Sequence, residues 1–89
     1  MIKTQIKVQN KLGLHTRAAA KLVNLSSTFE SKIELINNLS LANCKSIMSL
    51  ILLGASNETI LDLHINGNDE QKAFTAIENL FNNKFGEDE

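Results

Sequence analysis

The chain has 89 residues, of which 43% are hydrophobic and 21% charged, a composition typical of one globular domain and unlike that of a disordered or disulfide-stapled chain. The formal net charge of -1 argues against general nucleic-acid binding. The charges are nevertheless divided, since residues 1–45 hold seven basic and two acidic side chains whereas residues 46–89 hold two and eight. A basic surface formed by the first half would attract an acidic partner.

The cysteine and hydropathy patterns indicate a cytoplasmic protein. Cys44 is the single cysteine, so no intramolecular disulfide can form, and no Cys/His spacing predicts a metal site. The N-terminus alternates polar and apolar residues and lacks the apolar stretch of a signal peptide. The longest apolar run, residues 47–55, is interrupted by Ser49 and Gly54 and is far shorter than the ~20 residues that span a bilayer. We therefore expect one soluble, cytoplasmic domain over residues 1–89, without membrane insertion, metal or cofactor.

The first half of the chain predicts a strand, a helix and a hairpin. Residues 2–8 alternate apolar and polar side chains, as in a half-buried strand. A loop around Gly13 leads to a helical apolar period over residues 16–27. Residues 33–36 predict a second strand, Asn37 and Asn38 a turn, and residues 39–42 a short third strand that closes the hairpin.

The second half predicts a short helix, a strand and a longer helix. Ser46 is a good N-cap for an apolar segment, Ile47–Leu53, that Gly54 can end. Residues 59–65 alternate again and predict a fourth strand. Asn68 or Asp69 would cap a last helix with Glu70 near its start and Lys84 near its end, and its apolar stripe consists of Ala73, Phe74, Ile77, Leu80 and Phe81.

The resulting order, βαββαβα, predicts an α+β domain. Four short strands with one apolar face each need a cover, and three helices can supply it from one side. We therefore expect an open-faced two-layer sandwich in which three helices cover one face of a four-stranded antiparallel sheet. The last residues, 87–89, are acidic and are expected to form a frayed, solvated tail.

His15 is the candidate chemical residue, because it stands one residue before a predicted helix. The first turn of a helix carries unpaired backbone N–H groups and partial positive charge, so an anion on His15 would meet amides near Thr16 and Arg17. Arg17 adds a guanidinium suited to phosphate. Neutral imidazole is nucleophilic near pH 7, because its unperturbed pKa is about 6.5. His15 is thus a candidate phosphoryl acceptor, and the alternative on spacing alone is a solvated His–Arg surface pair.

Two motifs identify a family. The run Gly-Leu-His-Thr-Arg at residues 13–17 and the run Lys-Ser-Ile-Met at residues 45–48 resemble those of the HPr family of phosphocarrier proteins, and the resemblance extends over essentially the whole chain. It implies an HPr-like fold in which His15 accepts a phosphoryl group on Nδ1 from phosphorylated enzyme I of the phosphoenolpyruvate-dependent phosphotransferase system and passes it to an enzyme IIA. Arg17 would neutralise charge during transfer, so the chain would be a transfer intermediate and not an independent catalyst. Ala18 is a departure, since the family usually has proline in this first turn.

The resemblance gives Ser46 two readings. In many relatives the matching serine is phosphorylated by a dedicated kinase, which makes Ser46 a candidate regulatory site and a serine kinase a candidate partner. The alternative, which we favour, is that Ser46 only caps its helix. The resemblance also implies a partner-docking patch beside His15 with Leu50 and Leu53 in the core; the patch would consist of Ile47, Met48 and Ile51.

Further alternatives stay open at the level of sequence. Residues 80–88 look more like the nitrogen-related members, NPr, whereas Thr16 and residues 45–48 look more like the sugar-branch HPr proteins. A different class of function is a non-catalytic regulatory binding module that uses the Ile47–Leu53 helix. A monomer is the simplest state for a carrier that visits two partners with one face.

Overall fold

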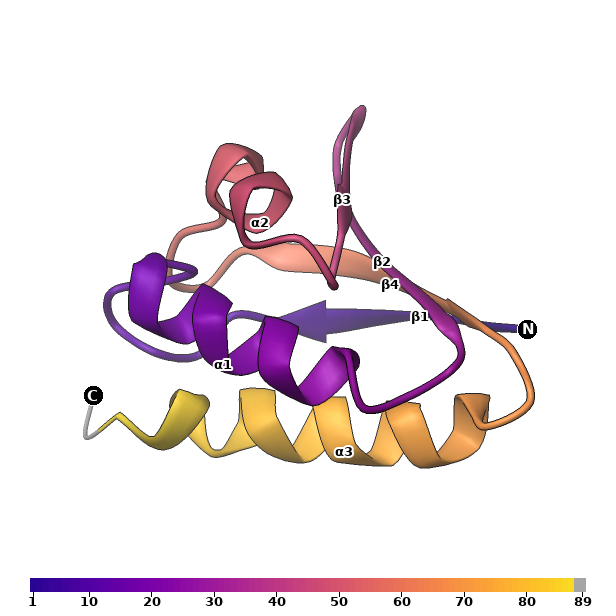
Figure 1. The fold of residues 1–89 in the computed structure, drawn as a ribbon. Helices are drawn as coiled ribbons and strands as arrows, with labels where there is room; N and C mark the ends of the chain where they lie inside the picture. Colours follow the sequence, from indigo (N-terminus) through magenta and orange to yellow (C-terminus); the bar gives the residue numbers. More distant parts are fainter. Residues whose placement is uncertain (88–89) are drawn as a thin grey trace.

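The computed structural model describes residues 1–87 and has the predicted order of elements (Figure 1). The strands are β1 (Ile2–Lys7), β2 (Lys32–Asn37), β3 (Ser40–Asn43) and β4 (Ile60–Asn66). The helices are α1 (Thr16–Ser26), α2 (Ile47–Leu53) and α3 (Glu70–Asn82), and a 3-10 turn, η1 (Lys84–Gly86), follows α3. The strands form one antiparallel sheet in the order β1-β4-β2-β3. The predicted α+β sandwich is confirmed.

The sheet and the helices share one hydrophobic core. Residues of alternate pleats point to the helices, so that Ile33 and Leu35 of β2 lie opposite Ile65 and Leu63 of β4, and all four side chains are fully buried. The helices bury one stripe each against this surface. Figure 1 shows α1 and α3 packed side by side over the sheet, with α2 beside β3. The end of α3 and the start of α1 consequently lie at the same end of the molecule.

The hairpin between β2 and β3 is displaced by one residue from its prediction. Its turn consists of Asn38 and Leu39, because Asn37 still pairs with Ser40. Asn38 has a φ of 58°, a left-handed conformation that asparagine tolerates better than most residues. Leu39 is fully exposed at the tip and belongs to the turn. The fourth strand is likewise shifted by one residue, to Ile60–Asn66.

Asp69 precedes α3 as predicted, but it does not cap the helix. Its carboxylate accepts hydrogen bonds from the Ser31 hydroxyl (2.5 Å), the Ser31 N–H (3.0 Å) and the Glu30 N–H (2.9 Å), and makes no capping bond. The side chain therefore joins the loop before β2 to the loop before α3. Lys84, expected near the end of the last helix, lies beyond α3 in η1.

Cys44 is fully buried beside the sheet. Burial, with the negative charge of Glu34, raises the pKa of its thiol to about 12. The thiol is therefore protonated at neutral pH and behaves as a small apolar side chain.

Replacing Asp69 by Asn should destabilise the protein at pH 7 and do so much less in acid. Hydrogen bonds from the Ser31 hydroxyl and the Glu30 N–H hold the pKa of the folded-state carboxyl below its usual value. The stabilisation is therefore present above the unfolded-state pKa and disappears as the pH falls through the folded-state pKa. Urea unfolding of both proteins at neutral and acid pH measures this difference. Asp62→Asn, on the uncovered face of the sheet, is the control, and an Asp69→Asn effect independent of pH would contradict the assignment.

Candidate functional site

The loop before α1 is fixed by contacts with the segment after α2. Gly13 has a φ of +70°, and a Cβ added there would lie 2.6 Å from the carbonyl oxygen of Ala55. The next N–H, of Leu14, donates to that same oxygen at 2.9 Å, and the Leu14 side chain is buried. The close approach and the left-handed backbone both require glycine at position 13. The loop is thereby held in place one residue before His15.

His15, Thr16 and Arg17 come together at the N-terminus of α1, as the sequence predicts. His15 is the residue immediately before the helix, with extended backbone angles, and its carbonyl oxygen accepts the Ala19 N–H at 2.8 Å. Its ring makes no capping hydrogen bond to the helix. Thr16 and Arg17 occupy the first turn and are exposed. The positive end of the helix is thus combined with an imidazole and an exposed guanidinium.

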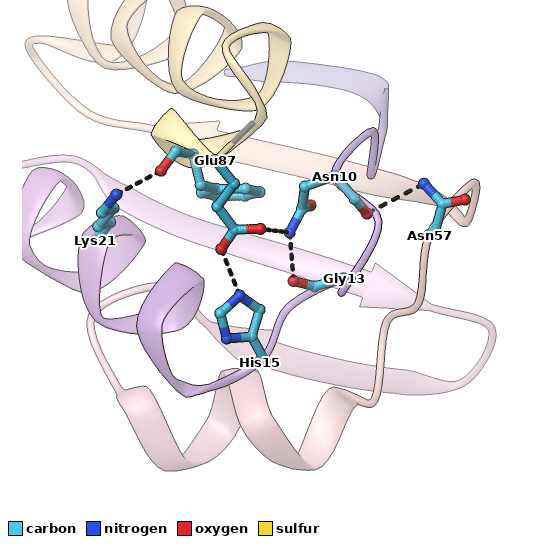
Figure 2. A network of polar contacts seen from close by, with 7 residues as sticks. Asn10, Gly13, His15, Lys21, Asn57 and Glu87 are labelled. Atoms are coloured by element: carbon cyan, nitrogen blue, oxygen red, sulfur yellow. Dashed lines mark hydrogen bonds and ion pairs between the residues drawn. The ribbon is translucent and has the colours of Figure 1, made fainter. Parts of the chain in front are cut away.

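The imidazole has a carboxylate partner that the sequence prediction missed. Nε2 of His15 lies 2.5 Å from Oε2 of Glu87, and only 25% of the His15 side chain and 10% of the Glu87 side chain are exposed (Figure 2). The expectation of a frayed tail is therefore wrong for Glu87, while Asp88 and Glu89 lie outside the described residues. A carboxylate at this distance from a ring nitrogen restricts the orientation of the imidazole.

A buried amide supports this carboxylate. Nδ2 of Asn10 donates to the second oxygen of Glu87, Oε1, at 2.9 Å and to the carbonyl oxygen of Gly13 at 2.7 Å. The backbone oxygen of Asn10 in turn accepts from Nδ2 of Asn57 at 3.1 Å. Asn10 is fully buried, although its sequence context indicated only a turn. Figure 2 shows these residues, from three separate parts of the chain, converging beside His15.

The Glu87 carboxylate is ionised at neutral pH. Partial burial alone raises its pKa, but hydrogen bonds from Asn10 and His15 and the charges of His15 and Arg17 outweigh this, so that the pKa lies below its usual value. The influence of Arg17 indicates that the guanidinium lies within electrostatic range of the same group. The site therefore contains one anion, one cation and one titratable ring at a helix N-terminus.

The helix α2 presents both core and surface residues. Leu50 and Leu53 are buried, as predicted, whereas Met48 is 61% exposed. Leu52, which was not among the predicted docking residues, is 77% exposed. Exposed apolar side chains on α2, which packs against α1, form what we call the α2 patch; it consists of Ile47, Met48, Ile51 and Leu52.

Ser46 caps α2. Its Oγ accepts the Ser49 N–H at 3.3 Å, and its backbone has the extended angles of an N-cap. Gly54 ends the helix in a left-handed conformation, with a φ of 69°. Both predicted ends of this helix are confirmed.

Within residues 1–87, no three His, Cys, Asp or Glu side chains are grouped so that they would hold a metal ion. None of the helices in this part of the chain combines the length and the apolar character needed to cross a membrane.

Comparison with known proteins identifies the family. The family model described as the PTS HPr component phosphorylation site matches residues 2–83. A phosphocarrier protein HPr from Xylella fastidiosa is 46% identical over 88 residues, which cover 99% of each chain. A phosphocarrier protein NPr from Proteus mirabilis is 34% identical over 85 residues, or 94% of each chain. The chain belongs to the HPr family of phosphocarrier proteins of the phosphotransferase system.

Solved structures agree with this assignment. A crystal structure of HPr-C-His from Thermoanaerobacter tengcongensis has a TM-score of 0.95 and 38% sequence identity, and each chain is covered in full. A structure described as an HPr dimer from the same organism has a TM-score of 0.78 and 39% identity, covering 98% of this chain and 100% of that one. The fold is therefore that of the HPr family.

Proposed function

We propose that the protein is a phosphocarrier in which His15 accepts a phosphoryl group on Nδ1 from phosphorylated enzyme I and passes it to an enzyme IIA. The observation that carries this proposal is the position of His15 immediately before α1, with Arg17 exposed in the first turn. Membership of the HPr family supports the same role. The proposed setting is the cytoplasm, and the proposed working state is a monomer.

The chemistry follows from the charges around the ring. A lone pair on the imidazole attacks phosphorus, and the negative charge of the transferring group is met by the first-turn N–H groups at Thr16 and Arg17 and by the Arg17 guanidinium. Phosphoryl transfer depends chiefly on positioning and electrostatic stabilisation, both of which a fixed helix terminus supplies. The carrier accepts and releases the same group, so it acts as an intermediate between two partners.

The same proposal assigns docking to the α2 patch, in which Ile47, Met48 and Ile51 would contact both enzyme I and enzyme IIA. Support comes from their exposure and from the packing of α2 against α1, the helix that His15 precedes. Apolar side chains exposed in a group are typical of interaction surfaces. Methionine is well suited to such a surface, because its flexible side chain adapts to different partners.

Beyond its favoured role as the cap of α2, Ser46 is a candidate regulatory phosphorylation site for a serine kinase. Its hydroxyl lies at the start of α2, next to Ile47 and Met48 of the patch. A phosphate there would add about two negative charges beside the docking surface, and would oppose an acidic partner while remaining compatible with the helix N-terminus.

The labelling experiment that tests the carrier uses phosphoenolpyruvate with sugar-branch or nitrogen-branch enzyme I in separate reactions. We expect an acid-labile label on the wild type, none on His15→Ala, and labelling of Arg17→Ala slowed about ten-fold, the equivalent of one charge-assisted hydrogen bond. The faster enzyme I assigns the branch. A folded wild type that neither enzyme labels would overturn the proposal and favour a regulatory binding module that uses α2.

A charge in the α2 patch should weaken docking without unfolding the protein. Met48→Glu is expected to raise the Kd for enzyme I about ten-fold or more, because an unpaired charge buried in an apolar contact costs at least the ~1.4 kcal/mol that corresponds to ten-fold. Isothermal titration measures this binding. Ile60→Glu is the matched control, since Ile60 is 60% exposed but lies on the uncovered face of the sheet. Equal Kd values for the two variants would place docking elsewhere.

The regulatory role of Ser46 predicts a difference between two substitutions. Ser46→Asp should weaken binding to enzyme I, because it adds negative charge beside the patch. Ser46→Ala should bind normally and lose about 1 kcal/mol of unfolding free energy with its cap. Titration with enzyme I and urea unfolding test the two halves, and normal binding by Ser46→Asp would contradict the charge mechanism.

A further inference from the structure

Glu87 makes the contact with His15 that neither the family motifs nor the relay chemistry requires. It lies beyond residues 2–83, to which the family model extends. Its two carboxylate oxygens have separate partners, Oε2 with the His15 ring and Oε1 with the Asn10 amide. Any role of this carboxylate concerns a ring that carries a phosphoryl group. The inference therefore rests on the proposed function.

The turn before Glu87 is built to hold it. Lys84, Phe85 and Gly86 all have left-handed backbones, with φ values of 53°, 56° and 75°. Such angles are unfavourable for lysine and phenylalanine, and they persist only where surrounding contacts impose them. Here the Phe85 ring is fully buried against Phe81, with ring centroids 4.8 Å apart.

A second contact fixes the same turn from α1. Nζ of Lys21 donates to the carbonyl oxygen of Phe85 at 2.6 Å. The helix that His15 precedes therefore also holds the residue two positions before Glu87. Figure 2 shows the Lys21 contact on one side of this turn and the Glu87 side chain on the other.

We propose that Glu87 is a positioning residue that keeps the proton of the His15 ring on Nε2 and so leaves Nδ1 unprotonated for the phosphoryl group. An ionised carboxylate only accepts hydrogen bonds, so the ring nitrogen that it touches must be the one that carries hydrogen. In a neutral imidazole the other nitrogen then holds the free lone pair. Figure 2 shows that this other nitrogen points away from Glu87.

The transfer step balances without any further reactant. The Nδ1 lone pair forms the N–P bond while the bond from phosphorus to the donor breaks, and its electron pair leaves with the donor. The ring gains positive charge, and its Nε2 proton stays in place between the ring and Glu87. The carboxylate stabilises this charge as the buried aspartate of a serine protease stabilises imidazolium. Because the phosphoryl group and the carboxylate occupy different nitrogens, their negative charges stay apart.

Asn10 makes the arrangement specific. Its Nδ2 donates to both Glu87 and Gly13, so its own oxygen, Oδ1, faces neither of them. The carboxylate is therefore held by a neutral donor on one oxygen and is left with the other for His15. Replacement of the Glu87 carboxylate, and not of the buried Asn10, is the cleaner test, because loss of a fully buried side chain would disturb the loop itself.

The first test measures the tautomer by 15N NMR of the His15 ring above its titration range, with no partner protein present. Wild type should carry hydrogen on Nε2. In Glu87→Gln a single amide oxygen faces two donors, the Asn10 amide and the His15 ring, so the preference for hydrogen on Nε2 should weaken. Glu87→Ala should show a mixture of tautomers. Glu78→Gln removes the same charge from an exposed position on α3 and should match the wild type.

The second test measures phosphorylation by enzyme I and phosphoenolpyruvate. Glu87→Ala should react about ten-fold more slowly than Glu78→Gln, the loss expected for one charge-assisted hydrogen bond, with Glu87→Gln between them. An unchanged tautomer in Glu87→Ala, with a labelling rate equal to that of Glu78→Gln, would overturn the role of Glu87 while leaving the carrier function intact. A wild type that is not labelled would instead reject the proposed function, and the tautomer measurement would still decide the pairing.

Discussion

The candidate site depends on one buried side chain amide. Asn10 binds the loop that leads to His15 through Gly13 and binds the segment after α3 through Glu87, while Asn57 holds its backbone from the loop before β4. Three segments that are distant in sequence therefore share one hydrogen-bonded junction. Because a buried donor left unpaired costs roughly 1–3 kcal/mol, the Asn10 Nδ2 group favours having the Gly13 and Glu87 segments in place together. The geometry around the imidazole is thus a property of the tertiary fold and not of the loop alone.

Local rules were sufficient for most of the fold. Alternation in the strands, the apolar stripe of α3, and the Ser46 cap with Gly54 at the other end of α2 are patterns between near neighbours, and they predicted the order of elements. The sequence predicts the hairpin turn one residue too early, because it contains two adjacent asparagines and only the pairing of Asn37 with Ser40 selects the turn. Asp69 illustrates a different limit, since a residue suited to capping found stronger donors in a distant loop.

The sequence predicts one part of the site, His15 and Arg17, but not the other part, Glu87. His15 and Arg17 are marked by a motif and by their place before a helix, both of which can be read locally. Glu87 follows α3 without any periodic pattern, and an acidic run beside a helix end is ordinarily solvated. The available signal was Phe85, a large apolar residue just beyond the last helical stripe, which is buried and so returns the chain to the core. Which carboxylate of the acidic run contacts the His15 ring is then decided by long-range contacts alone.

The left-handed turn at η1 separates the last core residue from the carboxylate beside His15. The hydrophobic core is complete once Phe85 is in place, yet the carboxylate beside His15 lies two residues further on. Loss of the chain after Gly86 would therefore leave the hydrophobic core in place but remove the carboxylate from the imidazole and from the Asn10 amide, whereas loss from Phe85 onward would open the core as well. Under the role proposed for Glu87, trimming at this end would change the reactivity of His15 before it opened the hydrophobic core.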